Sequence, residues 1–241
     1  MRQEPAGAPE QALGRRLATL NRVAAIAFVL GGSLFAVGAL LAQLGVGTMK
    51  SVNVTYLVGG FFFSLGGYTS ILMVVNAARG EHGRGTEGPM RWWGYLPHRR
   101  DWLSAAVLFA GTLLFAVSLV AAFAQGLTPR QSDGWIWLPD ILGCVCFLVS
   151  GRLAMLDLGG GHVEVHVHVL AWWVVAINQL GSVLFFLAGI AAFIRPATSA
   201  EVDAGLVNWG TFVGAACFAI GGVAQLFDKP TTTRTVVQHT P

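Results

Sequence analysis

Six apolar stretches, each long enough to cross a lipid bilayer, are the feature of this chain that most constrains its fold. A membrane-spanning helix needs about 20 consecutive, mostly apolar residues. The connections between the six stretches are short, so the sequence predicts an all-α transmembrane bundle of six helices without a separate soluble domain. The stretches cover approximately residues 21–43, 54–75, 103–124, 138–156, 170–194 and 207–226.

The composition agrees with a chain whose main solvent is lipid. Hydrophobic residues make up 54% of the chain and charged residues 11%, whereas a soluble domain has about 25% charged residues. The formal net charge of +3 is accounted for by membrane topology, and no nucleic-acid partner is expected. The lipid bilayer is the expected partner.

The distribution of basic residues predicts the orientation of the bundle. Most Arg and Lys residues lie in the two tails and in the long loop between the second and third stretches. The three connections on the other side hold one basic residue each, Lys50, Arg130 and Arg195. Because cytoplasmic loops carry the excess of basic residues, we expect a multi-pass protein of the plasma membrane with both termini in the cytoplasm. The same residues would attract anionic lipid head groups.

A short phrase recurs in all six stretches: a glycine, a phenylalanine four residues later, and a small residue seven residues later. Offsets of 4 and 7 place the three residues on one stripe of a helix. Small residues let two helices approach closely, and close packing drives helix association in lipid. The phrase therefore predicts helix-packing contacts at Gly31, Phe35, Gly59, Phe63, Gly111, Phe115, Gly143, Phe147, Gly181, Phe185, Gly214 and Phe218.

The six phrases group into three two-helix repeats. Because two spans return the chain to the same side of the membrane, we expect the three copies to be parallel. A basic, aromatic loop and a His-rich connector, both cytoplasmic, are expected to separate the repeats, and the two tails are expected to be disordered. The predicted order is tail 1–20, repeat 21–79, loop 80–101, repeat 102–157, connector 158–169, repeat 170–227 and tail 228–241.

Several of these segments resemble the YrhK-like domain, a small bacterial two-span module. The stretch Asn53–Tyr68 carries the resemblance with Val-Gly-Gly-Phe-Phe-Phe-Ser-Leu-Gly-Gly, and 178–185 and 208–218 carry it in the last repeat. The stretch 137–150 is similar to longer actinobacterial membrane proteins that contain such units in tandem. The resemblance covers about residues 21–227 and implies a two-helix module. It brings no established activity, ligand or catalytic residue.

Four polar residues stand one helical turn before a repeat glycine: Tyr56, Asp140, Asn178 and Thr211. Tyr56, Asp140 and Thr211 belong to helices that enter the membrane from the outer side, at similar depth. A polar ring of this kind could bind a cation or relay a proton. Alternatively, Asp140 follows Pro139 and caps the positive start of its helix at the membrane interface, or it makes a hydrogen bond to another helix. For Asn178 the alternative is a hydrogen bond between helices.

The connector contains the most chemically suggestive cluster, His162, Glu164, His166 and His168, which alternate with valines. In a strand these four side chains share one face, and in a helix they form two pairs at a spacing of four residues. Either geometry could bring them to a divalent metal such as Zn²⁺. The alternative is a polar or pH-responsive connector without metal. No other cofactor is predicted.

Three classes of function stay open, and no residue is predicted to be catalytic. The first is a non-catalytic structural or accessory membrane protein, acting as a homo-oligomer or with a membrane-protein partner. The second is a small transporter or channel that uses Asp140 and Asn178. The third is a metal-binding sensor or enzyme that uses the cluster between His162 and His168. The sequence favours the first, because the spans contain almost no charge and their small-residue stripes indicate tight packing.

Overall fold

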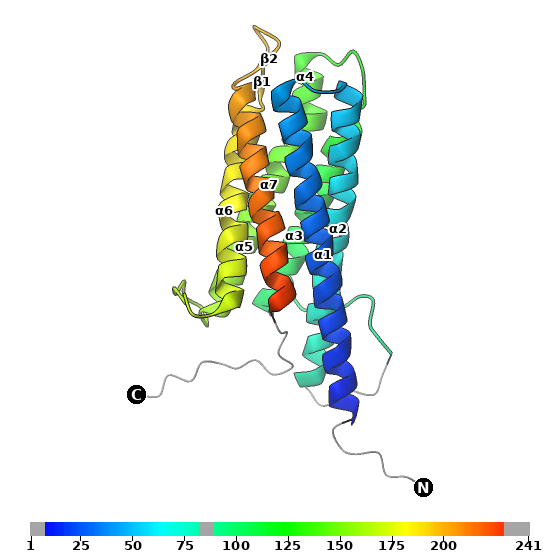
Figure 1. Cartoon of the computed structure of the whole chain (residues 1–241), viewed down its shortest axis with the longest axis vertical. Helices are drawn as coiled ribbons and strands as arrows, with labels where there is room; N and C mark the ends of the chain where they lie inside the picture. Colours follow the sequence, from blue (N-terminus) through cyan, green and yellow to red (C-terminus); the bar gives the residue numbers. More distant parts are fainter. Residues whose placement is uncertain (1–7, 82–88, 229–241) are drawn as a thin grey trace.

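The computed structural model describes residues 8–81 and 89–228. Within them, six helical segments are long and apolar enough to cross a membrane, so the prediction of a six-helix, multi-pass membrane protein is confirmed at that level. Figure 1 shows the elements in chain order. They are α1 (Ala8–Leu44), α2 (Met49–Glu81), α3 (Arg100–Ala121), α4 (Pro129–Ser132), the π-helical turn η1 (Asp133–Trp137), α5 (Leu138–Leu158), α6 (Leu170–Ala191), β1 (Ile194–Arg195), β2 (Ala200–Glu201) and α7 (Ala204–Phe227).

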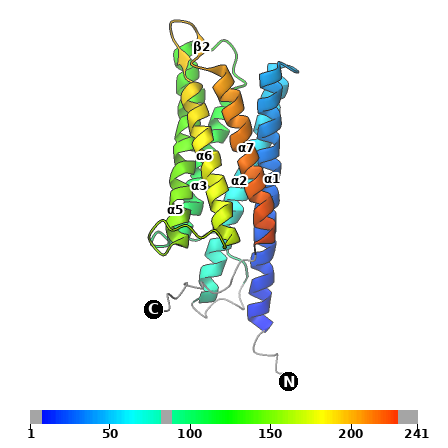
Figure 2. The same cartoon turned by 60° about the vertical axis from the view of Figure 1, so that its left-hand side comes forward.

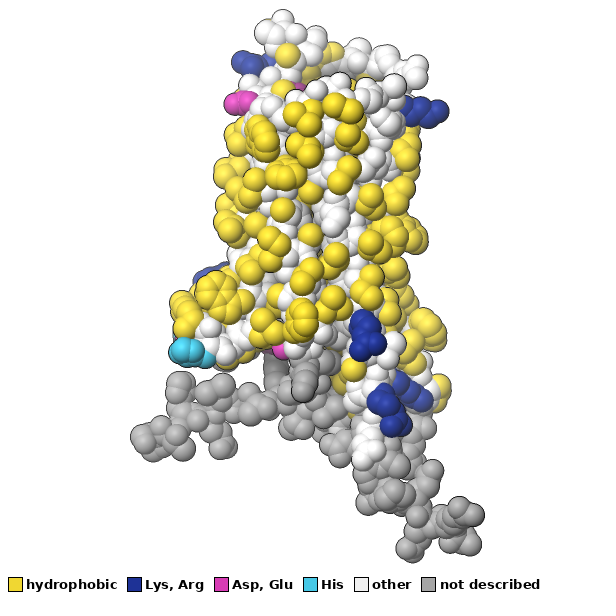
Figure 3. All heavy atoms as spheres, in the orientation of Figure 1, with side chains coloured by type: hydrophobic (Ala, Val, Ile, Leu, Met, Phe, Trp, Pro, Cys, Tyr) yellow, Lys and Arg dark blue, Asp and Glu magenta, His cyan; other side chains and the backbone are white. Residues whose placement is uncertain are grey.

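The flank of the bundle is apolar, and the charged side chains gather at its two ends (Figure 3). Exposed aliphatic side chains such as Ile26, Val117 and Ile220 lie on the outside of the helices. In water such a surface would be unstable, but in lipid it is the expected one. The end at which α1 begins and α7 ends is called the basic end here, because Arg15 and Arg16 lie there.

The six spanning helices run side by side along the long axis of the bundle (Figures 1 and 2), and their contacts close a ring. Each packs on the next in the order α1, α2, α3, α5, α6, α7, and α7 packs on α1. Two side-chain amides connect α1 with α7 at the basic end. Gln225 Nε2 donates to Asn21 Oδ1 at 2.9 Å, and Asn21 Nδ2 donates to the Gln225 carbonyl oxygen at 3.0 Å. Paired amides are well suited to this position, because a polar group away from water must find its partner within the protein.

The centre of the ring is filled by aromatic rings. Phe63, Phe147 and Phe218 contact one another pairwise, with ring centroids 5.4 to 6.1 Å apart. Each also contacts the phenylalanine of the helix joined to it in the same hairpin, at 5.1 to 5.4 Å. Edge-to-face and tilted pairs at this separation add about 0.5–1.5 kcal/mol each beyond simple burial. We call this set the phenylalanine cluster: Phe35, Phe63, Phe115, Phe147, Phe185 and Phe218.

The repeat glycines allow the two helices of each hairpin to meet. In α6 and α7, a Cβ added at Gly214 would lie 2.6 Å from Phe185 Cδ1 and 3.0 Å from the Gly181 carbonyl oxygen. A Cβ added at Gly181 would meet the Gly214 carbonyl oxygen at 2.8 Å and Phe218 Cδ2 at 3.1 Å. The same exchange, in which each glycine faces the partner's phenylalanine, occurs in the α1–α2 and α3–α5 hairpins between Gly31 and Phe63, Gly59 and Phe35, Gly111 and Phe147, and Gly143 and Phe115.

The prediction of a disordered tail over residues 1–20 is wrong for residues 8–20, which form the first turns of α1. Leu13 and Leu17, one turn apart, are buried, with exposed fractions of 6% and 1%. Leu13 Cδ2 packs against Gly80 near the end of α2, so this part of α1 is supported by an apolar contact that the sequence pattern did not reveal. Residues 1–7 and 229–241 of the predicted tails, and 82–88 of the predicted loop, lie outside the described residues.

Candidate ligand-binding site

A cavity of about 600 Å³ lies in the bundle at the end opposite the basic end. We call it the vestibule. The α1–α2 turn and the β1–β2 hairpin border its mouth, and its floor consists of Phe35, Phe115 and Phe185 from the phenylalanine cluster. Cavities that bind small molecules usually measure about 300–1,000 Å³. The vestibule has the size of a ligand site and ends at the aromatic centre of the bundle.

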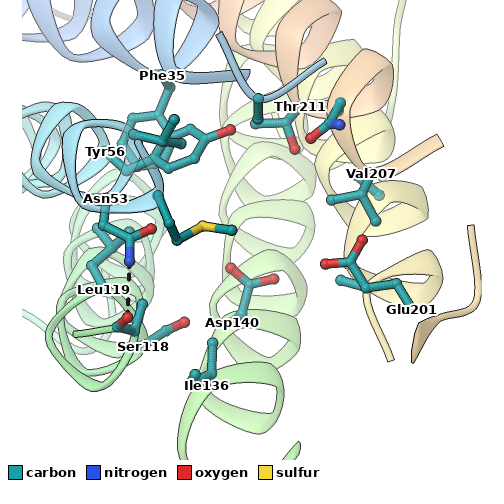
Figure 4. A pocket seen from close by; sticks show the side chains of 18 of the residues that line it. Phe35, Asn53, Tyr56, Ser118, Leu119, Ile136, Asp140, Glu201, Val207 and Thr211 are labelled. Atoms are coloured by element: carbon teal, nitrogen blue, oxygen red, sulfur yellow. Dashed lines mark hydrogen bonds between the residues drawn. The ribbon is translucent and has the colours of Figure 1, made fainter. Parts of the chain in front are cut away.

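Three of the four polar residues singled out in the sequence line this cavity together. Tyr56 on α2, Asp140 on α5 and Thr211 on α7 all belong to its wall. Figure 4 shows the Asp140 carboxylate pointing into the space, with Tyr56 and Thr211 on the far side. The three side chains therefore converge as expected. They line a common cavity and do not form a ring of direct contacts with one another.

The start of the helix that carries Asp140 differs from the prediction. The helical segment begins at Pro129, where the Thr128 side chain and Gln131 form a capping box, and it continues through η1 into α5. Asp140 is thus about three turns inside the helical segment, so the interpretation that it caps a helix start at the interface is wrong. The Pro139 signal misled because proline also fits inside a helix where a π-helical turn has already interrupted the regular hydrogen bonds.

The Asp140 carboxylate has neither a hydrogen-bond donor nor a cationic partner among the residues that the structure describes. The described lining of the vestibule contains no Lys, Arg or His at all. A carboxylate away from bulk water is costly unless it is paired or neutralised. Asp140 is therefore the group in the vestibule with the strongest unsatisfied tendency to bind a cation or a proton.

A second carboxylate lies at the mouth of the vestibule. Glu201 on β2 is partly exposed, and its partial burial raises the pKa of its carboxyl above the ordinary value. Figure 4 shows its side chain on the same side of the cavity as the Asp140 carboxylate. The hairpin is held by the Arg195 guanidinium, which donates to the Glu201 and Val202 carbonyl oxygens at 3.2 and 2.9 Å. Sequence reasoning did not single out Glu201, because it belongs to a connection and to no repeat position.

Three side chains hold the wall of the vestibule at equivalent positions, each three residues before Tyr56, Asp140 or Thr211. Asn53 Nδ2 donates to the Ala122 carbonyl oxygen at 2.8 Å, and Trp137 Nε1 donates to the Gly189 carbonyl oxygen at 2.8 Å. Asn208 Nδ2 donates to Gln43 Oε1 at 3.1 Å. Each bond connects one hairpin with its neighbour in the ring. Extending the repeat phrase by one further turn towards the N-terminus would have found all three positions.

Asn178, the fourth polar residue, lies elsewhere, on the basic-end side of the phenylalanine cluster. Its Oδ1 faces Gly221 on α7, and the Oε1 of the neighbouring Gln179 faces Gly151 on α5. Neither oxygen accepts a conventional hydrogen bond from the described residues, although both are buried. The glycine Cα–H groups are the atoms that these oxygens meet, a weak contact that recurs between closely packed helices. The expected hydrogen bond between helices is not made by the Asn178 oxygen.

Replacing Asn178 by leucine, a side chain of similar size, is expected to change the free energy of unfolding by less than about 1 kcal/mol. The oxygen that is lost has no conventional partner to leave unsatisfied, and an apolar replacement of similar shape is nearly neutral in such a case. Chemical unfolding of the purified protein in mixed micelles measures this. A loss of more than 3 kcal/mol would show that Asn178 makes a strong polar contact.

The His-rich connector is neither a strand nor a helix between residues 163 and 169. The indole N–H groups of Trp172 and Trp173 donate to the Glu164 and Val167 carbonyl oxygens at 3.0 and 2.9 Å, which holds the connector against the start of α6. His166 Nε2 lies 3.4 Å from Glu164 Oε2. In the described part of the chain no three His, Cys, Asp or Glu side chains come together as metal ligands. A metal at His162, Glu164, His166 and His168 stays a prediction.

Fold and site together define a class: a multi-pass helical membrane protein with an acidic, aromatic vestibule that ends inside the bundle. No family model matches the chain, and neither the curated proteins nor the solved structures contain a significant match to it.

Proposed function

We propose that this protein is a non-catalytic accessory membrane protein that binds a small ligand in the vestibule. The proposal rests on the observation that the cavity stops at the phenylalanine cluster and does not continue through the bundle. Below the floor, Phe63 and Phe147 are 3% and 2% exposed and contact Phe218 as well as each other. A cavity that has convergent polar groups and a packed floor is suited to binding rather than to conduction.

The proposal includes three parallel two-helix repeats with both termini in the cytoplasm. The equivalent glycine contacts of the three hairpins and the equivalent donors Asn53, Trp137 and Asn208 support the repeats. The basic end supports the orientation, because basic residues favour the cytoplasmic side. In this orientation the vestibule opens to the outside of the cell. The YrhK-like resemblance would then apply to each hairpin separately.

A transporter is the second candidate, and one observation favours it. Polar side chains lie on both sides of the phenylalanine cluster, Asp140 on one side and Asn178 and Gln179 on the other. A pathway between them would require the rings of the cluster to separate during a transport cycle.

The two candidates differ in flux across a membrane. The flux would be measured in proteoliposomes loaded with a pH-sensitive or cation-sensitive dye. Because the floor of the vestibule is packed, we expect the flux of H⁺, Na⁺ or K⁺ into proteoliposomes to be no larger than the flux into protein-free liposomes. A flux that the parent protein carries and the Asp140→Asn variant does not would favour the transporter instead.

Binding is tested with a variant that fills the cavity. Small molecules that raise the melting temperature of the detergent-purified parent are expected to have no effect on Thr211→Trp, because an indole on α7 occupies the vestibule. The matched control is Leu206→Trp, which places the same side chain at an exposed position of the same helix and should keep the parent's response. If no molecule in a broad panel acts on the parent, or if Thr211→Trp responds like the parent, the vestibule is not a binding site.

A further inference from the structure

We propose that the ligand of the vestibule is an organic cation, a protonated amine or a quaternary ammonium with a compact apolar body, whose positive group lies at Asp140. This inference rests on the proposed function, since it names the class of molecule that the cavity takes. It draws on the charge of the lining, on the shortage of oxygen ligands and on the aromatic floor.

The charge of the vestibule has one sign. Asp140 lies in the wall and Glu201 at the mouth, and the described lining contains no basic side chain. The Arg195 guanidinium lies outside the lining, on the Glu201 and Val202 carbonyl oxygens. Opposite charges attract far more strongly in a cavity with apolar walls than in water. The two carboxylates between the mouth and the wall of the vestibule therefore raise the local concentration of cations and repel anions. A cation at Asp140 would also remove the cost of an unpaired carboxylate.

The lining suits an organic cation better than a metal ion. Ca²⁺ takes six to eight oxygen ligands and Mg²⁺ takes six in octahedral geometry. Asp140 and Glu201 are the two carboxylates of the lining, with the hydroxyl groups of Tyr56 and Thr211 across the cavity (Figure 4), and among the described residues no three His, Cys, Asp or Glu side chains come together as metal ligands. A small inorganic ion would also leave most of the roughly 600 Å³ unfilled. An ammonium group needs only one carboxylate, and its carbon atoms can fill the remaining space.

Aromatic side chains complete the match. Phe35, Phe115 and Phe185 form the floor and Trp137 belongs to the wall near Asp140. The faces of aromatic rings attract ammonium groups, and clusters of such rings are the usual way in which proteins recognise quaternary ammonium ions. The same rings would also pack against the apolar body of the ligand.

Pairs of molecules that differ only in charge test this inference. We would titrate the detergent-purified protein calorimetrically with choline and its uncharged analogue 3,3-dimethylbutan-1-ol, and with benzylamine and benzyl alcohol at pH 7, with protein-free micelles as the blank. At least one cation is expected to bind ten times or more tightly than its uncharged partner. In Asp140→Asn that cation should lose at least tenfold in affinity, while the uncharged partner binds as before. Glu164→Gln removes a carboxylate on the connector at the basic end and should change nothing.

The outcomes separate this inference from the proposed function. If cation and uncharged partner bind equally in both pairs, the vestibule takes apolar molecules such as lipid or detergent, and the inference is overturned while binding itself stands. If none of the four molecules binds, the inference is overturned and the proposed function loses support as well. Should Asp140→Asn not fold, the comparison in the parent decides, and a preference below threefold for both cations rejects the inference.

Discussion

Replacing Gly214 by alanine is expected to destabilise the bundle by about 1–3 kcal/mol, and replacing it by leucine to prevent folding. An added Cβ would lie 2.6 Å from Phe185 Cδ1 and 3.0 Å from the Gly181 carbonyl oxygen. Phe185 cannot move away easily, because it is packed against Phe218 and Phe35 at 5.3 and 6.2 Å. Overpacking of a dense interior costs about 1–3 kcal/mol even for small additions.

The matched control is Gly134→Ala in η1, where an added Cβ would meet nothing within 4 Å. Alanine is the better helix former by roughly 1 kcal/mol, so this variant should be as stable as the parent or slightly more stable. Melting temperature and elution profile in detergent measure both variants. Equal stability of Gly214→Ala and the parent would mean that α6 and α7 are not packed as closely as described.

Replacing Phe147 by alanine is expected to cost about 3 kcal/mol. Phe147 is 2% exposed and contacts Phe63, Phe115 and Phe218. Truncating a buried phenylalanine typically costs about 3–5 kcal/mol. The lower end applies here, because the unfolded chain in lipid keeps the ring in apolar surroundings, and what is lost is packing rather than transfer from water.

Phe61→Ala is the control for this prediction, because Phe61 lies on the outer face of α2 with 66% of its surface exposed. Its truncation should cost less than about 1 kcal/mol, since lipid chains replace the ring. Unfolding in mixed micelles distinguishes the two variants. Similar losses for both would indicate that the phenylalanine cluster is not the centre of the packing.

Much of the architecture was predictable because lipid imposes strong constraints on sequence. Six apolar stretches gave six helices, and the spacing of residues such as Gly31 and Phe35 predicted which face of each helix is buried. The convergence of Tyr56, Asp140 and Thr211 followed from the same spacing. These predictions depend on helical periodicity alone, which is fixed by backbone geometry.

Other features depend on contacts that periodicity does not encode. The helical start at Pro129 moved Asp140 from a helix end into the wall of a cavity. The vestibule itself is lined by side chains from all six spanning helices, whose relative placement the repeat phrase does not determine. Asn178 has the same place in the phrase as Asp140, but its helix enters from the basic end, so it lies on the other side of the cluster. Glu201 lies at the mouth of the vestibule only because the β1–β2 hairpin folds beside that mouth.

The central claim is that the vestibule opens at one end of the bundle and is closed from the other by the phenylalanine cluster. Labelling with a membrane-impermeant maleimide from either side of sealed vesicles tests it most directly. The target is Thr211→Cys in the vestibule, the markers are Arg130→Cys and His162→Cys at exposed positions of the two opposite ends, and the parent protein gives the background of the native cysteines.

We predict that Thr211→Cys reacts from the same side as Arg130→Cys and not from the side of His162→Cys, whichever way the protein lies in the membrane. Reaction of Thr211→Cys from the His162 side, or equally from both sides, would contradict the account.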